Sequence, residues 1–102
     1  MGMSSSLPTL ETLLPRLHQS FAATAADLPA FRMELVQAEP LRNPSPLAGG
    51  RKGFRLLFRA TEGDLPVQRT LRVEAEDGQA WSFFCVPVLH AEPGRHIEAI
   101  FN

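Results

Sequence analysis

The sequence predicts a mainly β protein, a small five-stranded antiparallel barrel with a short N-terminal helix. Apolar and polar residues alternate in several segments, as they do in half-buried strands. Short turn sequences separate these segments, and no helical stretch lies between them, so the strands must pair largely antiparallel. Short, strongly twisted strands close into a barrel more readily than they form a flat sheet.

The length of the chain is that of one small domain. The chain has 102 residues, of which 44% are hydrophobic, and this is enough for a core of its own. We assign residues 9–102 to the barrel domain. Residues 1–8 are rich in serine, and we expect them to be disordered.

The helix is predicted at the start of the domain. Leucines recur at three- and four-residue spacing in "TLETLLPRL", which is one helical stripe. Thr9 suits the N-cap position, and Glu11 suits the first turn. Pro15 cannot lie in a helix interior without loss of a hydrogen bond. We therefore expect one or two helical turns between Thr9 and Gln19, broken at Leu14 or restarted at Pro15.

Residues 20–29, "SFAATAADLP", show no clear pattern of apolar residues, so this segment could form either a short strand or an irregular connector. In "AFRMELVQAE" the apolar residues then recur at every second position, which predicts the first clear strand. A Pro/Gly-rich loop over residues 40–53 leads to the second strand, "GFRLLFRA". We expect Phe54, Leu56 and Phe58 on its inner face, with Arg55 and Arg59 on the outer face.

Three further strands follow. "QRTLRVEAE" alternates cleanly, and Asp77-Gly78 after it is the strongest hairpin signal in the chain. "AWSFFCVPVL" is apolar on both faces, as a central strand should be, and Pro87 places its end at an edge or bulge. "RHIEAIFN" ends the chain. The shared core is predicted from the inward positions of all strands: Phe31, Leu35, Leu56, Phe58, Leu71, Val73, Phe83 and Ile97.

Composition narrows the location and the class of partner. Cys85 is the single cysteine, so no disulfide can form within the chain, and a lone thiol suits a reducing compartment. We find no secretory signal and no apolar run of the roughly 20 residues that a membrane span needs. The expected location is the cytoplasm, with no membrane contact. A net charge of −1 gives no global attraction to nucleic acid.

The order of elements resembles the Sm-like variant of the small SH3-type barrels over roughly Thr9 to Asn102. Sm proteins read RNA through two loop signatures, an aspartate followed by a methionine-asparagine pair and an arginine-glycine pair. The corresponding loops here read "TEGDLPV" and "LHAEPGRH", and neither carries a signature. The resemblance therefore implies the fold, and it leaves RNA binding only as an alternative.

The pieces "LETLLP", "ELVQAEPL", "FRLLFRA", "FFCVPV" and "IEAIFN" resemble a family of small bacterial proteins defined only as a domain of unknown function. They cover most of the chain. Members of this family are often encoded near phage-tail-like or tail-collar proteins. The resemblance implies a structural or accessory role, and it supplies no catalytic residue.

The chemistry-bearing residues do not form a recognisable catalytic or metal motif. Cys85 lies in an apolar strand, where a buried and inert thiol is expected. His18, His90 and His96 are too scattered for a zinc site. Carboxylates before the Asp77 hairpin fit a solvated strand face, and the glycines at 49, 50 and 53 precede no helix that could hold a phosphate. We expect no enzyme activity, no cofactor and no metal.

A basic segment is the one local charge excess in the chain. Between residues 40 and 61 there are five basic residues and no acidic one. Arg72 could join them if its strand pairs with this segment, and Glu34 and Glu74 could neutralise them across strands. No aromatic residue is interleaved with them as a stacking platform. The candidate contacts for a partner or a nucleic acid are Arg42, Arg51, Lys52, Arg55, Arg59 and Arg72.

The last strand offers a second candidate surface. If the barrel stays open, a terminal strand leaves unpaired amides that invite another chain. The candidate contacts on this edge are His96, Glu98 and Ile100. The sequence thus favours a non-catalytic interaction or assembly module that self-associates or binds a protein. The alternative is a weak Sm-like RNA-binding protein that uses the basic segment 42–59.

Overall fold

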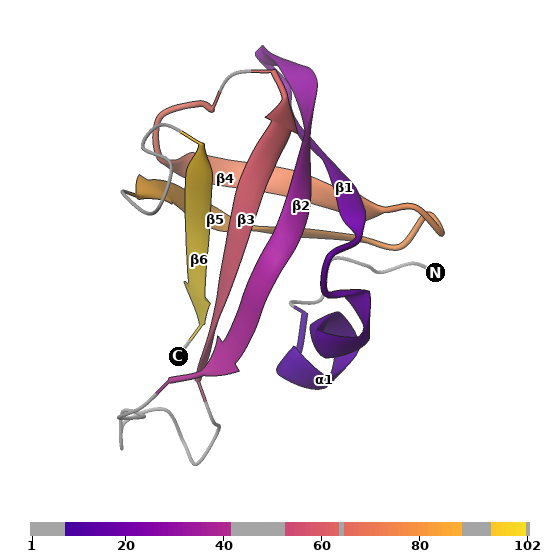
Figure 1. Cartoon of the computed structure of the whole chain (residues 1–102). Helices are drawn as coiled ribbons and strands as arrows, with labels where there is room; N and C mark the ends of the chain where they lie inside the picture. The colour runs from indigo at the N-terminus through magenta and orange to yellow at the C-terminus, as the bar shows by residue number, and fades with distance from the viewer. Residues whose placement is uncertain (1–7, 42–52, 64, 89–94, 102) are drawn as a thin grey trace.

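The computed structural model of the chain describes residues 8–41, 53–63, 65–88 and 95–101. Over these residues six strands wind into one barrel, and two short helical turns lie beside β1 and β2 (Figure 1). The elements are α1 (Leu10–Leu13), the 3-10 turn η1 (Leu14–Arg16), β1 (Ser20–Ala25), β2 (Leu28–Pro40), β3 (Phe54–Glu62), β4 (Arg69–Ala75), β5 (Ala80–Val88) and β6 (His96–Phe101).

The strands follow one another around the barrel in the order β1-β2-β3-β6-β5-β4, and β4 pairs with β1 to close it. Every pairing is antiparallel. The predicted class, a small antiparallel barrel with a short N-terminal helix, is confirmed. The expected number of strands was too small by one, because "SFAATA" forms β1. Its outward residues are alanine and threonine beside inward Phe21 and Ala23, so the contrast between its two faces is weak.

The N-terminal turns form as the leucine stripe and Pro15 predict. The Thr9 hydroxyl accepts a hydrogen bond from the amide of Thr12 at 3.1 Å, which caps α1. Pro15 lies in the first turn of η1, where its missing amide costs no hydrogen bond. Leu13 is buried in the core. Of the residues expected to be disordered, 1–7 lie outside the described part, and Pro8 is buried.

The inward phase of the strands agrees with the alternation of the sequence. All eight residues predicted to share the core are buried in one cluster. The long strand β2 keeps its apolar residues inward by means of a bulge at Val36, where the register with β3 shifts. Because of the extra residue, Leu35 before the bulge and Ala38 after it both pack against the core.

A row of aromatic rings runs through the barrel. Phe58 of β3 lies at 5.7 Å from Phe21 of β1 and at 6.3 Å from Phe83 of β5, measured between ring centroids. Phe83 contacts Phe101 at 5.3 Å, and Phe101 stacks on Phe54 at 4.5 Å. Pairs at such separations stabilise a core beyond their buried area. The row connects strands on opposite sides of the barrel.

The β4–β5 hairpin is tied to the N-terminal turns. Gly78 adopts a φ of +93°, which lets the short Asp77-Gly78 turn close as predicted. The guanidinium of Arg16 donates to Asp77 at 2.9 Å and to the side chain of Gln79 at 3.0 Å, and lies 5.5 Å from the Trp81 ring. Its hydrogen bond lowers the pKa of Asp77. Arg16 therefore holds η1 against this hairpin.

The central position of Phe58 makes a clear prediction for stability. Phe58→Ala should lower the free energy of unfolding by about 3–5 kcal/mol, since it leaves a cavity between Phe21 and Phe83. Val67→Ala is the control, because Val67 is 75% exposed and its loss should cost less than about 0.5 kcal/mol. Urea denaturation measures both values. Equal unfolding midpoints for the two variants would contradict the position of Phe58 in the core.

Candidate functional site

Three of the six residues of the predicted basic surface lie in the part of the chain that the structure describes. Arg42, Arg51 and Lys52 lie outside the described residues. Arg55 and Arg59 lie on the outer face of β3, as predicted. Arg72 lies on β4. Their usefulness for a partner depends on which other side chains already bind them.

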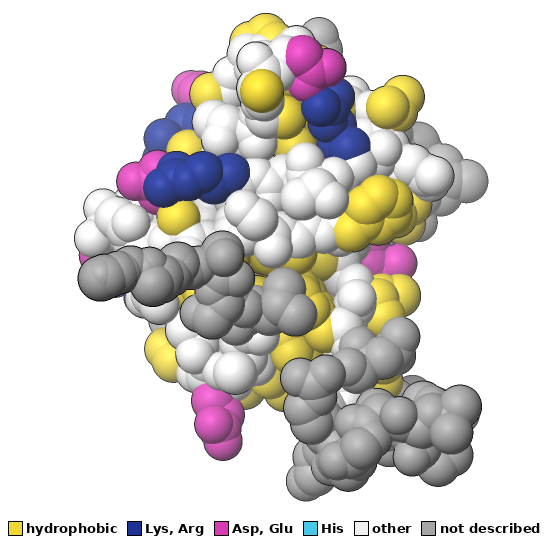
Figure 2. All heavy atoms as spheres, turned by 180° about the vertical axis from the view of Figure 1, so that it is seen from behind, with side chains coloured by type: hydrophobic (Ala, Val, Ile, Leu, Met, Phe, Trp, Pro, Cys, Tyr) yellow, Lys and Arg dark blue, Asp and Glu magenta, His cyan; other side chains and the backbone are white. Residues whose placement is uncertain are grey.

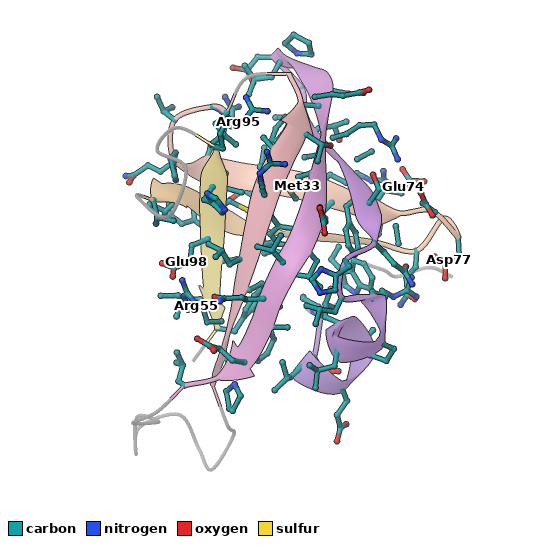
Figure 3. The ribbon with its side chains drawn as sticks, in the orientation of Figure 1. Met33, Arg55, Glu74, Asp77, Arg95 and Glu98 are labelled. Carbon is teal, nitrogen blue, oxygen red and sulfur yellow. The ribbon has the colours of Figure 1, made fainter. Side chains whose placement is uncertain are left out.

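Arg55 is at the centre of a polar network across three strands. Its Nε donates to the carboxylate of Glu98 on β6. Its Nη1 lies 3.1 Å from Gln37 Oε1 and 3.1 Å from Glu39 Oε2, both on β2. Figure 3 shows Arg55 and Glu98 side by side on the lower part of β3 and β6. The Arg55 side chain is only 22% exposed, so this guanidinium is already bound by the protein itself.

The same network explains a buried leucine on the outside of the barrel. Leu57 shares the outer face of β3 with Arg55, yet it has no exposed surface and does not belong to the core cluster. Its neighbours across the ladders are Gln37 on β2 and Glu98 on β6. Arg55 hydrogen-bonds to both of these side chains. The network therefore lies over Leu57, and the stem of Arg55 can cover it while its charge is paired.

Arg59 lies in a similar position further along β3. It is opposite Glu34 of β2 in one ladder and opposite His96 of β6 in the other. Glu34 also lies 3.1 Å from Nδ1 of His18. A carboxylate thus stands directly across from this arginine, as the sequence predicted for Glu34.

Arg72 does not join this surface, so that expectation was wrong. Its strand, β4, pairs with β1 and β5 and not with β3. Its Nη1 lies 2.7 Å from Glu74 Oε1 on the same strand. In Figure 3, Glu74 lies on the opposite side of the barrel from Arg55. The sequence alone could not show this, because strand order around a barrel is a long-range property.

The prediction of β6 as an edge strand was also wrong. β6 lies between β3 and β5, and His96–Glu98 are paired on both sides. Of the three predicted edge contacts, His96 is buried and Glu98 is bound to Arg55. Ile100 is 53% exposed, and it alone of the three is open to a partner. Because β6 pairs with β3 and β5 in the closed barrel, the edge that the sequence predicted at His96–Glu98 does not exist.

An exposed aromatic residue that sequence reasoning missed lies on the adjacent strand. Phe84 of β5 points outward and is 53% exposed. The β5–β6 register pairs Val86 with Glu98, so Phe84 and Ile100 are the next outward residues on the two strands as they diverge. We call these two residues the β5–β6 corner. The signal was present in "AWSFFCVPV", where Phe84 falls on the outer face if Phe83 faces inward.

The surface on this side of the molecule is notably apolar. Figure 2, seen from behind, shows hydrophobic side chains on the lower half of this face, some of them beside residues that are not described. Charged side chains on the same view are few, and they lie mainly in the upper half and along the outline of the molecule. An apolar area rimmed by polar residues is typical of a surface that binds another protein.

Cys85 is placed where a thiol is chemically inert. It is fully buried in the core on the same face of β5 as Phe83, and its Sγ lies 3.6 Å from the carbonyl oxygen of Phe83. Burial raises the pKa of this thiol to about 12. The thiolate is the nucleophilic form, and almost none of it exists in the folded protein near neutral pH.

The described residues contain no cluster of three or more His, Cys, Asp and Glu that could hold a metal ion. His90 lies outside the described residues, so the predicted His90–His96 turn cannot be placed. In the same part of the chain, none of the helices has the length and hydropathy needed to cross a membrane.

The environment of Cys85 predicts its reactivity. In native buffer at neutral pH the thiol should react with an aromatic disulfide reagent orders of magnitude more slowly than in denaturant, because it is buried and protonated. Above about pH 9 the unfolded thiol loses its proton while the folded thiol keeps it, so the free energy of unfolding should fall as pH rises. Equally fast reaction in native and denaturing buffer would contradict the buried position.

Comparison with known proteins agrees with the family resemblance. No curated protein and no solved structure matches the chain. A family model described as a domain of unknown function (DUF6916) matches residues 8–101, which include both helical turns and all six strands. The match covers nearly the whole of the 102 residues. The chain therefore belongs to the family of the DUF6916 domain of unknown function.

Proposed function

We propose that this protein is a non-catalytic interaction module that takes part in the assembly of a larger protein structure. One observation carries the proposal: the β5–β6 corner exposes Phe84 and Ile100, whereas five of the described arginines are already bound to carboxylates. Aromatic and aliphatic side chains held on a rigid sheet are typical anchors of protein interfaces. The arginines that form ion pairs with carboxylates are Arg16, Arg32, Arg55, Arg69 and Arg72.

The chemistry of the described residues supports a role without catalysis. Cys85 has a raised pKa and lies in the core. The two lowered carboxyl pKa values, of Asp27 and Asp77, result from hydrogen bonds to Arg69 and Arg16 at exposed turns. A general acid would instead need a raised pKa in an enclosed site. These shifts are those of structural ion pairs.

The wider setting of the assembly comes from the family resemblance. Members of the family that the chain resembles are often encoded near phage-tail-like or tail-collar proteins, and this favours an accessory role in building such a structure. A cytoplasmic location is part of the proposal and rests on the lone thiol of Cys85. No cofactor is needed for this role.

A site-specific photo-cross-linker tests the proposal. Placed at Ile100, it should form covalent adducts with protein in an extract of the source organism, and these adducts should resist nuclease. The matched control is Thr61, which is exposed on β3 away from the corner. Adducts of discrete mass from position 100 and not from position 61 would support an interaction module. Adducts that nuclease removes, or equal labelling from both positions, would contradict it.

The nucleic-acid alternative makes a different prediction. Since Arg55 and Arg72 are bound to carboxylates, we expect no complex with single-stranded RNA or DNA tighter than about 10⁻⁴ M in fluorescence anisotropy at physiological salt. A micromolar complex that weakens with salt, with a log–log slope of about −0.7 per phosphate contact, would support the alternative.

The variants for that measurement follow from the ion pairs. Arg55→Glu would place a third carboxylate beside Glu39 and Glu98, and it would therefore disturb the fold as well as any binding. Arg55→Gln keeps hydrogen-bonding capacity and is the better substitution. If a complex is found, its loss in the combined Arg42, Arg51 and Lys52→Gln variant, with the fold unchanged by circular dichroism, would assign it to the basic segment.

A further inference from the structure

Strand β5 changes its neighbour halfway along its length. Residues Ala80–Cys85 pair with β4, whereas Val86–Val88 pair with β6. From Val86 back towards Ala80, β5 and β6 diverge, and no strand of the described residues pairs with that side of β5. We call residues 80–84 on this side the β5 edge. Among the described strands it is an unpaired edge in a barrel that is otherwise closed.

The alternation of hydrogen bonds shows which backbone groups point to this free side. At the hairpin, the amide of Ala75 donates to the carbonyl of Gln79 at 2.8 Å. Hydrogen-bonded and non-hydrogen-bonded pairs alternate along an antiparallel ladder. The odd residues of β5 therefore direct their amides and carbonyls towards β4, and the even residues direct theirs away. The even residues of the β5 edge are Ala80, Ser82 and Phe84.

The β6 side of the ladder agrees with this assignment. Val86, the next even residue, is paired with Glu98 of β6. The odd residue Pro87, which has no amide hydrogen, lies beyond the end of β4, where no donor is required. Both facts fit an edge at which Ala80, Ser82 and Phe84 direct amides and carbonyls that no described strand pairs.

The β5 edge lacks the features by which proteins usually protect a free strand. Such edges normally carry lysine, an inward-pointing charge, proline or a bulge. The strand reads "AWSFFCVPV" and contains no charged residue, and its one proline lies in the half that pairs with β6. Ser82 is exposed, and Phe84 adds an exposed ring at the edge. Among the described residues, Arg16 of η1 lies against the hairpin end of the edge, and the edge itself carries no charge, proline or bulge that opposes an incoming strand.

We propose that the β5 edge pairs with the β5 edge of a second copy of this chain, antiparallel and centred on Ser82. The inference rests on the proposed function and identifies the partner of the β5–β6 corner. A two-fold axis through the pair can pass at an even residue, which forms a hydrogen-bonded pair, or at an odd residue, which forms a non-hydrogen-bonded pair. With the axis at an odd residue, no more than two of the three even residues pair within the edge. Centring on Ser82 uses all three even residues of both copies. Centring on Phe84 would require Val86, which already pairs with Glu98.

The side chains suit this register. Phe84 comes opposite the partner's Ala80, a small residue that leaves room for the ring, and Ser82 comes opposite the partner's Ser82. No charged residue on one edge faces a charge on the other, so the pairing meets no like-charge repulsion at contact. A second copy fits an edge without charge better than an acidic or basic segment does.

The like charges nearest to the proposed contact are the Arg72 residues of the two copies, which lie on β4, the strand next to β5. Arg72 stands opposite Ser82 on β4, and it is bound to Glu74. In the proposed pair, the two Arg72 residues are three strand spacings apart, about 14 Å. That exceeds the Debye length of about 10 Å at 0.1 M salt. Their repulsion is therefore screened.

Disulfide cross-linking tests the register directly. Opposed residues of an antiparallel pair have Cα atoms about 4.5–5.5 Å apart, which a disulfide can span. Ser82→Cys should therefore form a covalent dimer under mild oxidation at low protein concentration. Thr70→Cys is the control, since Thr70 is exposed on β4, one strand away from the edge. Native Cys85 stays buried in both variants.

Analytical ultracentrifugation tests the association without a cross-link. The full chain should sediment as a dimer at high concentration. Phe84→Lys places a charge on the edge and should weaken the dimer by at least about tenfold in Kd. Thr70→Lys adds the same charge to the neighbouring strand and should leave the Kd within about threefold. Equal thermal unfolding of both variants verifies that the fold is kept.

Three results would overturn the proposal. The first is a monomer at all concentrations. If the chain then dimerises only after removal of residues 1–7, its own N-terminal segment occupies the edge instead. The second is a dimer that both lysine variants weaken equally, with no Ser82 cross-link, which would place the contact elsewhere. The third is a monomer whose position 100 cross-links to a different protein, in which case the proposed function stands and the second copy is rejected.

Discussion

Closure of the barrel depends on β1, which pairs with β2 on one side and with β4 on the other. If β1 were absent, both neighbours would carry free edges, and the ring of Phe21 would be lost from the aromatic row at Phe58. In a closed barrel most strands are paired on both sides and leave no free edge. The divergence of β5 from β6 remains, and it is there that the exposed apolar side chains of the corner stand. The position of the candidate interface thus follows from how the sheet closes.

The geometry of the sheet also determines which side chains Arg55 contacts. Alternation puts Arg55 on the outer face, and the ladders place Gln37 and Glu98 on either side of the next outward residue, Leu57. An apolar residue there would be exposed unless something covered it. Arg55 hydrogen-bonds to both flanking side chains, so its charge is paired in a position from which its stem can cover Leu57. Arg55, one of the five basic residues between residues 40 and 61, is therefore part of the wall of the barrel.

The sequence predicted local features well because they depend on alternation and turn chemistry. The phase of Phe58, the Asp77-Gly78 hairpin and the Thr9 cap all follow from neighbouring residues. The sequence of β1 does not distinguish a strand from a connector, because the two faces of this strand differ little in polarity at Ala22 and Ala23. Features that depend on distant pairing could not be predicted. Neither the burial of His96 on β6 nor the separation of Arg72 from β3 has a signal in a short stretch of sequence.

Strand β5 combines two tasks in one run of nine residues. Its odd positions build the core, where Trp81, Phe83 and Cys85 are buried. Its even positions face outward, and their backbone groups are directed away from β4. Because successive side chains of a strand point to opposite faces, Ser82 and Phe84 can change without loss of core contacts. Association at this edge is therefore separable from folding, and a variant that changes the one while keeping the other can reveal what the surface is for.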